Sequence, residues 1–461
     1  MILLLFISSL GLLFSQQSWY NHPELNWKTI ETKNFIICFH QNTERSAGEV
    51  ANIAEQIFEG VTSLYDFIPD EKTTIIIKDV DDYSNGAAYY FDNKIIISGK
   101  PMDYDLRGAH RWLQDVITHE FTHIIQLGAS MKYTRHVPGS YFQVLDYEDE
   151  KREDVLYGYP NKIVSCPIPN TTVPPWFAEG TAQYMYDGAN FDYWDSIRDM
   201  ILRDRVLNDN LLTFNEMNTF GKCGIGNEST YNQGFSLVKY IVKEYGEDKL
   251  RLITSSLSDP FTFSIDKSIE HIFSKSSEDL YNDWKNEISQ IYSEQIVSHS
   301  GEKNYKLIET EGTTNIHPVW SPDGNSFLFL TNKENDYFGQ TDLFLYSLES
   351  EKSKKIKGGI KSAPTWVSDS LIVYAKKSKP NKHGSKFFDL YSYNIKEEEE
   401  TRLTVDLRLF SPVYDNSNDK IYAVNTYDGT NNIVAVDNLK KQSEYEKLTD
   451  FNNGLQIFSI S

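Results

Sequence analysis

Apolar and polar residues near the start of the chain follow two different periods. Residues 34–39 and 73–78 are apolar and β-prone, whereas residues 48–67 between them place apolar side chains at helical spacing. Residues 94–98 form another β-prone stretch, and the Asn-Gly pair at 85–86 before it indicates a hairpin-like reversal. The pattern predicts a small α/β layer made of these strands and one helix.

A second helix is predicted directly after the last of these strands. Gly128 is a typical stop signal at its C-terminal end. The sequence His-Glu-Phe-Thr-His at 119–123 lies within this helix. The apolar residues that recur at helical spacing are Leu113, Val116, Ile117, Phe121, Ile124 and Ile125.

The chain then loses its period and recovers it later. Residues 131–175 are rich in Pro, Gly, Asp and Tyr without sustained periodicity, which predicts a long loop. Helical patterns return in four stretches, so we expect the first domain to end near residue 300. These stretches are Trp176–Tyr186, Tyr193–Val206, Gly234–Tyr245 and Ser277–Gln295.

Beyond residue 300 short strands and turns repeat. The run Pro-Val-Trp-Ser-Pro-Asp-Gly at 318–324 is echoed at 364–369 and at 412–415, and its aromatic residue recurs after 46 and then 48 residues. A second element follows it at 342–348 and 389–395, and more weakly at 432–436. A period of about 40 to 50 residues with several strands is typical of β-propeller blades. The acidic run Glu397 to Glu400 is predicted to be a solvated loop between blade strands.

The repeats predict about three blades, fewer than the four that closed propellers typically need. One more spacing after Tyr414 reaches position 462, one residue beyond Ser461. Residues 447–449 also match the blade-ending residues 402–404. We therefore expect the propeller to be incomplete in this chain.

Length, composition and charge restrict the classes of protein. With 461 residues the chain is too long for one ordinary core, and 40% hydrophobic residues supply enough core material for two or more domains. The formal charge of −21 argues against nucleic acid as a partner and against docking on an anionic membrane through a basic surface.

The N-terminus predicts export. Residues 2–14 form an apolar run about as long as a signal-peptide core, followed by small and polar residues near Ser15, and the run is too short to span a bilayer. We expect a signal peptide at residues 1–15 and a secreted, periplasmic or cell-envelope protein without another membrane helix. The alternative is a buried N-terminal strand or helix. Among the three cysteines, a Cys166–Cys223 disulfide is compatible with an oxidising compartment, and the pairing stays open.

The helix at 119–123 carries a candidate metal site. His119 and His123 are four residues apart, so both imidazoles leave one helix face and can reach one zinc ion, and Glu120 then lies beside the metal. A catalytic zinc needs a third protein ligand, and Glu179 on the predicted helix at 176–186 is the best candidate. The alternatives are two incidental histidines on an amphipathic helix and a capping or surface role for Glu179. Two other histidines, His110 and His136, are worse placed and are predicted to be ordinary polar residues.

With these motifs the sequence resembles the gluzincin metallopeptidases, the thermolysin-like superfamily, and more closely the peptidase MA-like group that joins such a domain to a TolB-type propeller. The resemblance covers nearly the whole chain after the apolar N-terminus. It implies an α+β zincin-like metallopeptidase domain at residues 16–300 and an all-β propeller at 301–461. It also implies that His119, His123 and Glu179 bind Zn²⁺ and that Glu120 is the general base.

The resemblance places two further features. The strand at 94–98 would be the edge along which an extended peptide substrate pairs. Thermolysin has an acidic residue four positions after its ligand glutamate that orients a ligand histidine, whereas Gln183 stands here, a weaker acceptor for a histidine N–H.

A hydrogen-bond donor besides zinc is expected for the oxyanion of the tetrahedral intermediate. Tyr231, which precedes the helical stretch at 234–245, is the candidate, and the alternative is an aromatic ring that packs the helix start.

Two functions from different classes are compatible with these features. The first is a secreted zinc metallopeptidase that hydrolyses a peptide or protein substrate and recognises substrates or an envelope partner through the propeller. The second is a non-enzymatic cell-envelope binding or scaffold protein with a structural or vestigial metal site. Glu120 favours the enzyme, because a purely structural zinc site does not need a base beside its ligands.

Overall fold

The computed structural model describes most of the chain after the N-terminal apolar run. Ser15, His110, His136 and Cys223 lie outside the described residues, and so does the Cys166 side chain, so the expected signal peptide and disulfide stay predictions. The described residues are 22–101, 111–135, 140–146, 162–168, 170–185, 196–220, 224–297, 305–335, 337–437 and 440–452.

A five-stranded sheet with the strand order β1-β2-β3-β5-β4 begins the fold. The β2, β3 and β5 strands are parallel, whereas β1 and β4 are antiparallel to their neighbours at the two edges. The strands are β1 Trp27–Glu31, β2 Phe35–His40, β3 Thr73–Lys78, β4 Gly86–Tyr89 and β5 Lys94–Ser98.

Two sequence expectations about this sheet are wrong. The strands at 73–78 and 94–98 are parallel neighbours rather than the arms of a hairpin, and the reversal lies between β4 and β5 through the short helix η1, Tyr90–Asp92. The edge strand on this side is β4, and β5 lies inside the sheet. The missed strand Gly-Ala-Ala-Tyr is short and lacks branched apolar residues, so its pattern gave no strand signal.

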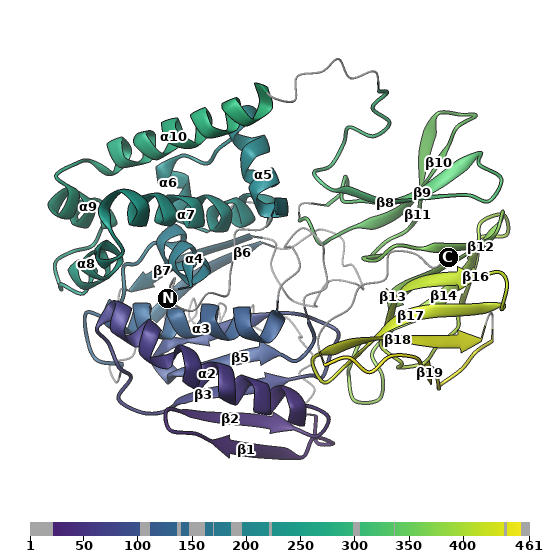
Figure 1. Cartoon of the computed structure of the whole chain (residues 1–461), viewed down its shortest axis with the longest axis horizontal. Coiled ribbons are helices and arrows are strands. Elements are labelled where there is room, and N and C mark those ends of the chain that lie inside the picture. Colours follow the sequence, from purple (N-terminus) through teal and green to yellow (C-terminus); the bar gives the residue numbers. More distant parts are fainter. Residues whose placement is uncertain are drawn as a thin grey trace, which may run out of the picture.

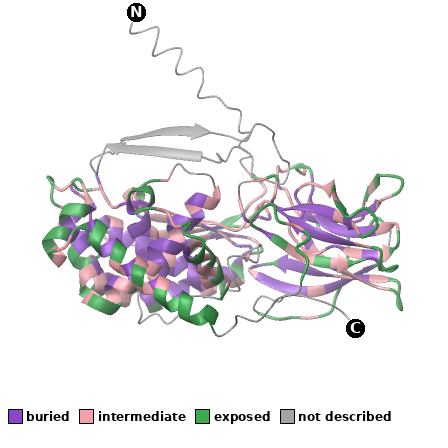
Figure 2. Cartoon of the chain, turned by 90° about the horizontal axis from the view of Figure 1, so that it is seen from above, coloured by how far each residue is buried: buried purple, intermediate pink, exposed green. Residues whose placement is uncertain are grey.

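Alternating residues bury one face of the sheet against helices. Phe35, Ile37, Ile75, Ile77 and Ile95 have no exposed surface, and they belong to the same core as α2 (Glu44–Tyr65) and α3 (Trp112–Ala129). Strands with one buried face show this period of two. Figure 1 shows α3 lying between the sheet and a further group of helices, and Figure 2 shows buried residues continuing through that group.

The four helical stretches expected after residue 175 are present. The short α6, α8 and α9 were not expected, and α7 begins ten residues earlier than its pattern indicated. The expected loop at 131–175 contains an antiparallel pair, β6 and β7, so that expectation is partly wrong. The elements are β6 Ser140–Asp146, β7 Lys162–Ile168, α4 Pro175–Tyr184, α5 Ser196–Leu207, α6 Phe214–Met217, α7 Gly224–Tyr245, α8 Asp248–Leu257, α9 Ile265–Phe273 and α10 Ser277–Val297.

Three four-stranded sheets form the C-terminal region, one for each sequence repeat. Near the start of each third strand, a side chain accepts a hydrogen bond from a later backbone N–H: Asp342 from Gly359, Asp389 from Leu407 and Asn432 from Phe451. The strands are β8 Asn315–Trp320, β9 Ser326–Thr331, β10 Asp342–Ser347, β11 Lys352–Lys357, β12 Thr365–Ser368, β13 Leu371–Lys377, β14 Phe388–Asn394, β15 Glu399–Arg402, β16 Leu409–Asp415, β17 Lys420–Tyr427, β18 Thr430–Asp437 and β19 Glu446–Lys447.

The chain is therefore multidomain, with an α/β and helical first part and an all-β second part (Figure 1). Among the described residues the three sheets do not close into a ring. The acidic run at 397–400 is not a loop throughout, because β15 begins at Glu399 and Glu400 pairs with Lys376 at 2.7 Å. No helix among the described residues is long and apolar enough to cross a membrane.

Candidate metal centre

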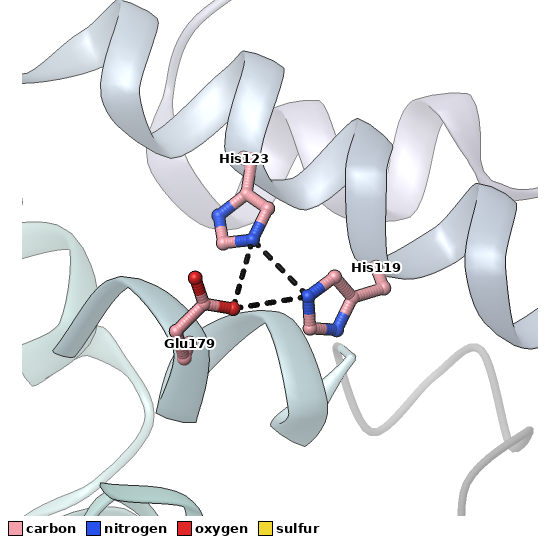
Figure 3. Close-up of side chains that lie close together, drawn as sticks. All are labelled: His119, His123 and Glu179. Carbon is pink, nitrogen blue, oxygen red and sulfur yellow. Dashed lines mark hydrogen bonds and ion pairs between the residues drawn. The ribbon is translucent and has the colours of Figure 1, made fainter. Parts of the chain in front are cut away.

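Two helices bring the expected ligands together. His119 and His123 project from α3, and Glu179 projects from α4, which packs against it (Figure 3). The Nε2 atom of each histidine lies 3.2 Å from Glu179 Oε2, and the two Nε2 atoms lie 3.1 Å apart. Three ligand atoms around a tetrahedral zinc ion are separated by about 3.3 Å, since zinc–ligand distances are about 2.0 to 2.1 Å. The triangle therefore fits a zinc ion.

The three groups do not satisfy one another without an ion. Protons on both Nε2 atoms would point toward the same oxygen and bring two N–H donors against each other. The side chains are mostly buried, with exposed fractions of 17% for His119, 10% for His123 and 13% for Glu179, so this conflict between them is costly. A shared cation resolves it. Within the described residues, these three are the group of His, Cys, Asp or Glu side chains with metal-binding geometry.

The pKa values follow from burial and from the close pairing. Burial lowers the pKa of His119 to about 4, although its hydrogen bond to Glu179 opposes the shift. Burial alone would raise the pKa of Glu179, but the two histidines outweigh it and hold that pKa well below its usual range. Burial alone would lower the pKa of His123, but Glu179 outweighs it and raises that pKa. Metal binding requires His119 and His123 to be neutral and Glu179 to be ionised, so it is coupled to the release of any proton that these groups carry.

Glu120 lies beside this triangle with 7% of its surface exposed. Burial raises its pKa to about 7, with a further contribution from Glu179, while His123 and the backbone N–H of Ala88 favour the ionised form. A carboxylate with a pKa near neutrality is suited to take and return a proton. Gly86 in β4 lets the strand approach it, because a Cβ atom at that position would lie 2.5 Å from Glu120 Oε1.

A cavity of about 340 Å³ opens over these groups. It is lined by the three ligand residues and Glu120, by residues 84–88 before and within β4, and by Tyr231 and Arg198. The structure thus brings every site residue expected from the sequence into one cavity. Tyr231 lies inside α7 rather than before a helix, and its ring contacts Phe220 with the centroids 5.9 Å apart.

Two side chains near this cavity differ from the expectation or were missed. With its amide oxygen turned toward the Arg198 guanidinium, Gln183 accepts from Arg198 and donates to the Tyr231 backbone carbonyl at 3.0 Å. It therefore does not support a histidine, and the Nδ1 atom of His123 is buried without a hydrogen-bond partner. Arg198 stands in no recognisable motif, so no sequence pattern indicated its place at the cavity.

The position of Glu179 depends on close packing between α4 and α7. A Cβ atom on Gly180 would lie 2.5 Å from the backbone of Gly234, and one on Gly234 would lie 2.4 Å from the carbonyl oxygen of Trp176. The two helices therefore meet backbone to backbone at these glycines. This contact sets the distance between α4 and α7 and so fixes Tyr231 on α7 relative to Glu179 on α4.

Comparisons with known proteins bear on each part of the chain. Residues 161–290 match the model of the Peptidase MA superfamily, a segment that includes Glu179 and Tyr231 but not the His119–His123 motif. The chain is also 31% identical over 113 residues to the Tol-Pal system protein TolB of Ruthia magnifica subsp. Calyptogena magnifica. That match covers 24% of this chain and 24% of TolB.

Solved structures overlap with the chain only in part. TolB from Acinetobacter baumannii is 14% identical with a TM-score of 0.24, and the match covers 30% of this chain and 32% of that one. The β-propeller domain of the Trilobed protease from Pyrococcus furiosus is 16% identical with a TM-score of 0.25, and the match covers 32% and 47% of the two chains. These overlaps are too small to carry an argument about function.

Proposed function

We propose that this chain is a secreted zinc-dependent metallopeptidase of the gluzincin type, whose three C-terminal sheets are propeller blades that recognise a substrate or an envelope partner. One observation carries the proposal. Two imidazole nitrogens and one carboxylate oxygen converge within 3.2 Å of one another beside a cavity that also contains a buried glutamate. This set provides three zinc ligands, an open side and a base.

In this proposal His119, His123 and Glu179 hold the ion. Zinc bound there would supply Lewis acidity, which polarises a carbonyl group and lowers the pKa of water. Glu120 takes the proton of the attacking water and delivers it to the leaving amine, a role that its buried place beside the three ligands and in the same cavity supports. Tyr231 donates a hydrogen bond to the developing oxyanion.

The extended substrate pairs with β4 rather than with the strand at 94–98. Among the described strands β4 pairs only with β5, which leaves an edge where an extended peptide could pair, and residues 86–88 line the cavity. Main-chain pairing on that edge would lay a peptide across the face of Glu120.

The comparisons support this proposal at a coarser level. The Peptidase MA match supports a peptidase, and the TolB match supports the propeller and a location in the cell envelope. The proposed export also rests on the apolar run at residues 2–14. A non-enzymatic envelope binding protein is the competing function, and the two differ in whether Glu120 acts on a substrate.

Metal analysis combined with a mixed-peptide cleavage screen tests the proposal. Purified protein is expected to contain one zinc per chain and to cleave peptides. Glu120→Gln, purified in the same way, should retain the zinc and lose turnover by about 10²- to 10⁴-fold, because only the base is removed. Glu59→Gln changes an exposed glutamate on α2 and should behave as the wild type. Zinc-loaded wild type that cleaves no peptide, or a fully active Glu120→Gln protein, would refute the peptidase.

A further inference from the structure

The segment between β3 and β4 joins the first part of the molecule to the C-terminal sheets. It contains Asp79 and Asp82, and Arg408 reaches both from the loop that precedes β16. The two terminal nitrogens of Arg408 lie 2.7 Å from the two carboxylate oxygens of Asp79, and its Nε atom lies 2.7 Å from Asp82 Oδ1. The side chains are 12%, 4% and 1% exposed, so this forked ion pair is shielded from water.

Asp82 also forms hydrogen bonds with the second C-terminal sheet, which consists of β12 to β15. Its backbone N–H donates to the Lys386 carbonyl at 3.2 Å, and its Oδ2 atom accepts from the Phe388 N–H at 2.7 Å. Both carboxylate oxygens of Asp82 are therefore used across the junction. Just after β5, the buried Lys100 places its Nζ atom 4.6 Å from the ring centroid of Phe410.

The same segment leads directly to the candidate active site. The Asn85 carbonyl accepts from the Ser98 N–H at 2.8 Å, which starts the pairing of β4 with β5. At Gly86 the strand approaches Glu120 so closely that a Cβ atom there would lie 2.5 Å from Oε1, and residues 86–88 line the same cavity as Glu120. Only three residues separate Asp82 from Gly86, so a shift at the junction is transmitted to the strand and to the base.

We propose that Arg408 is a positioning residue for the active site. By clamping Asp79 and Asp82, the C-terminal sheets set the position of β4, and β4 in turn sets the carboxylate of Glu120 and the edge that receives the substrate. The kinetic part of this inference rests on the proposed peptidase function, whereas the structural part does not. The sheets then form part of the catalytic unit as well as a recognition surface.

A second contact across the same junction provides a matched control. Asp428 accepts hydrogen bonds from the backbone N–H groups of Arg45 at 2.9 Å and Ser46 at 3.0 Å, at the start of α2. It therefore joins the same two parts of the molecule through charge and hydrogen bonding. Its hydrogen bonds across the junction go to Arg45 and Ser46, and among the described residues neither of these belongs to β4 or lines the cavity. Loss of this contact loosens the junction without acting on the proposed path.

Hydrogen–deuterium exchange and peptidase kinetics on the full chain test the proposal. In Arg408→Ala, the amides of β4 should exchange about 10- to 100-fold faster than in the wild type, because two buried carboxylates lose their partner. Asp428→Ala should speed exchange at the start of α2 and leave β4 unchanged. In kinetic measurements, Arg408→Ala should lower kcat/KM by about 10²-fold. Part of this loss should be a lower kcat, because a misplaced base slows the chemical step, and the zinc content should stay that of the wild type.

Arg408→Lys keeps the charge but not the fork, and it should give smaller changes in both measurements than Arg408→Ala. If Arg408→Ala does not fold, the exchange and kinetic measurements on Arg408→Lys decide the proposal instead. Unchanged exchange in β4 in these variants, or an equal effect of Asp428→Ala on β4, would overturn the inference. If the wild type is no peptidase, the proposed function fails, and exchange in β4 still decides whether Arg408 positions the strand.

Discussion

Two buried clusters of charged groups behave in opposite ways. At the junction, the Arg408 guanidinium is matched to Asp79 and Asp82 by forked hydrogen bonds, and each group finds a partner of opposite charge. In the candidate metal centre, two imidazole nitrogens and one carboxylate oxygen lie within 3.2 Å of one another, with His119 and His123 Nε2 only 3.1 Å apart. The first cluster is complete as it stands, whereas the second is the one for which we propose a bound cation.

The difference separates structural charges from functional charges. Burying ions is costly, and a protein recovers that cost within its own structure only when every group is paired. The cluster of Arg408, Asp79 and Asp82 meets this condition and can act as a fixed support. The metal centre does not meet it, which is expected where binding of an external ligand recovers the cost. The predictions below test this contrast, from the largest effect to the smallest.

Replacing a ligand should abolish metal binding and turnover together. His119→Ala, His123→Ala and Glu179→Ala are each expected to lose stoichiometric zinc, measured by elemental analysis, and all detectable peptidase activity. Free zinc at 100 times its Kd should stabilise the folded wild type by about 2.7 kcal/mol and so raise its melting temperature. The melting temperatures of these variants should not rise with zinc. Glu120→Gln is the control and should keep the zinc-induced rise. A ligand variant that retains zinc would show that the triangle is not the metal site.

Removing the Tyr231 hydroxyl should affect chemistry alone. Tyr231→Phe keeps the ring contact with Phe220, so zinc content and melting temperature should change little. Turnover should fall by about 10²- to 10³-fold if the hydroxyl serves the oxyanion. Tyr240→Phe, a tyrosine on the same helix outside this cavity, is the control. Wild-type turnover in Tyr231→Phe would leave Tyr231 as a packing residue.

Adding a methyl group where α4 and α7 cross, by Gly180→Ala, should disturb the candidate metal centre indirectly, through the position of α4. Gly180→Ala forces its Cβ atom to 2.5 Å from the backbone of Gly234, and overpacking of this kind costs about 1 to 3 kcal/mol. Unfolding temperature and zinc affinity should both fall, because α4 carries Glu179. Gly48→Ala in α2 meets no atom within 4 Å and should be neutral or slightly stabilising. Equal behaviour of the two variants would contradict the close-packing account.

The pH dependence of stability at Asp81 tests whether the charges in the segment between β3 and β4 are all paired favourably. Burial raises its pKa above the usual 3.8, Asp82 adds to the shift, and Lys377, 4.0 Å away, opposes it. A carboxyl with a raised pKa in the folded state destabilises the fold when ionised, and this cost disappears once the pH falls below the unfolded pKa. Asp81→Asn should therefore raise the melting temperature slightly at pH 7.5, and this gain should vanish near pH 3.5. A loss of stability at pH 7.5 would show that the Asp81 charge supports the junction.

Local pattern predicted much of the fold and most of the site. Spacing alone placed His119 and His123 on one face of a helix, and it found the four main helical stretches and the three β repeats. The short β4 escaped because Gly86 to Tyr89 has too few branched residues to signal a strand. The strand at 94–98 was consequently mistaken for the edge.

What the sequence determined by itself is therefore local: which residues form helices and strands, and which side chains share a face, since both follow from the period of a few neighbouring residues. Tertiary structure decided the order of strands in the sheet, the turn of Gln183 toward Arg198, and the clamp of Arg408 on Asp79 and Asp82. The two ends of that clamp lie 329 residues apart. Charge pairs of this kind cannot be found from the periodicity of the sequence, because they depend on how whole domains pack rather than on local spacing.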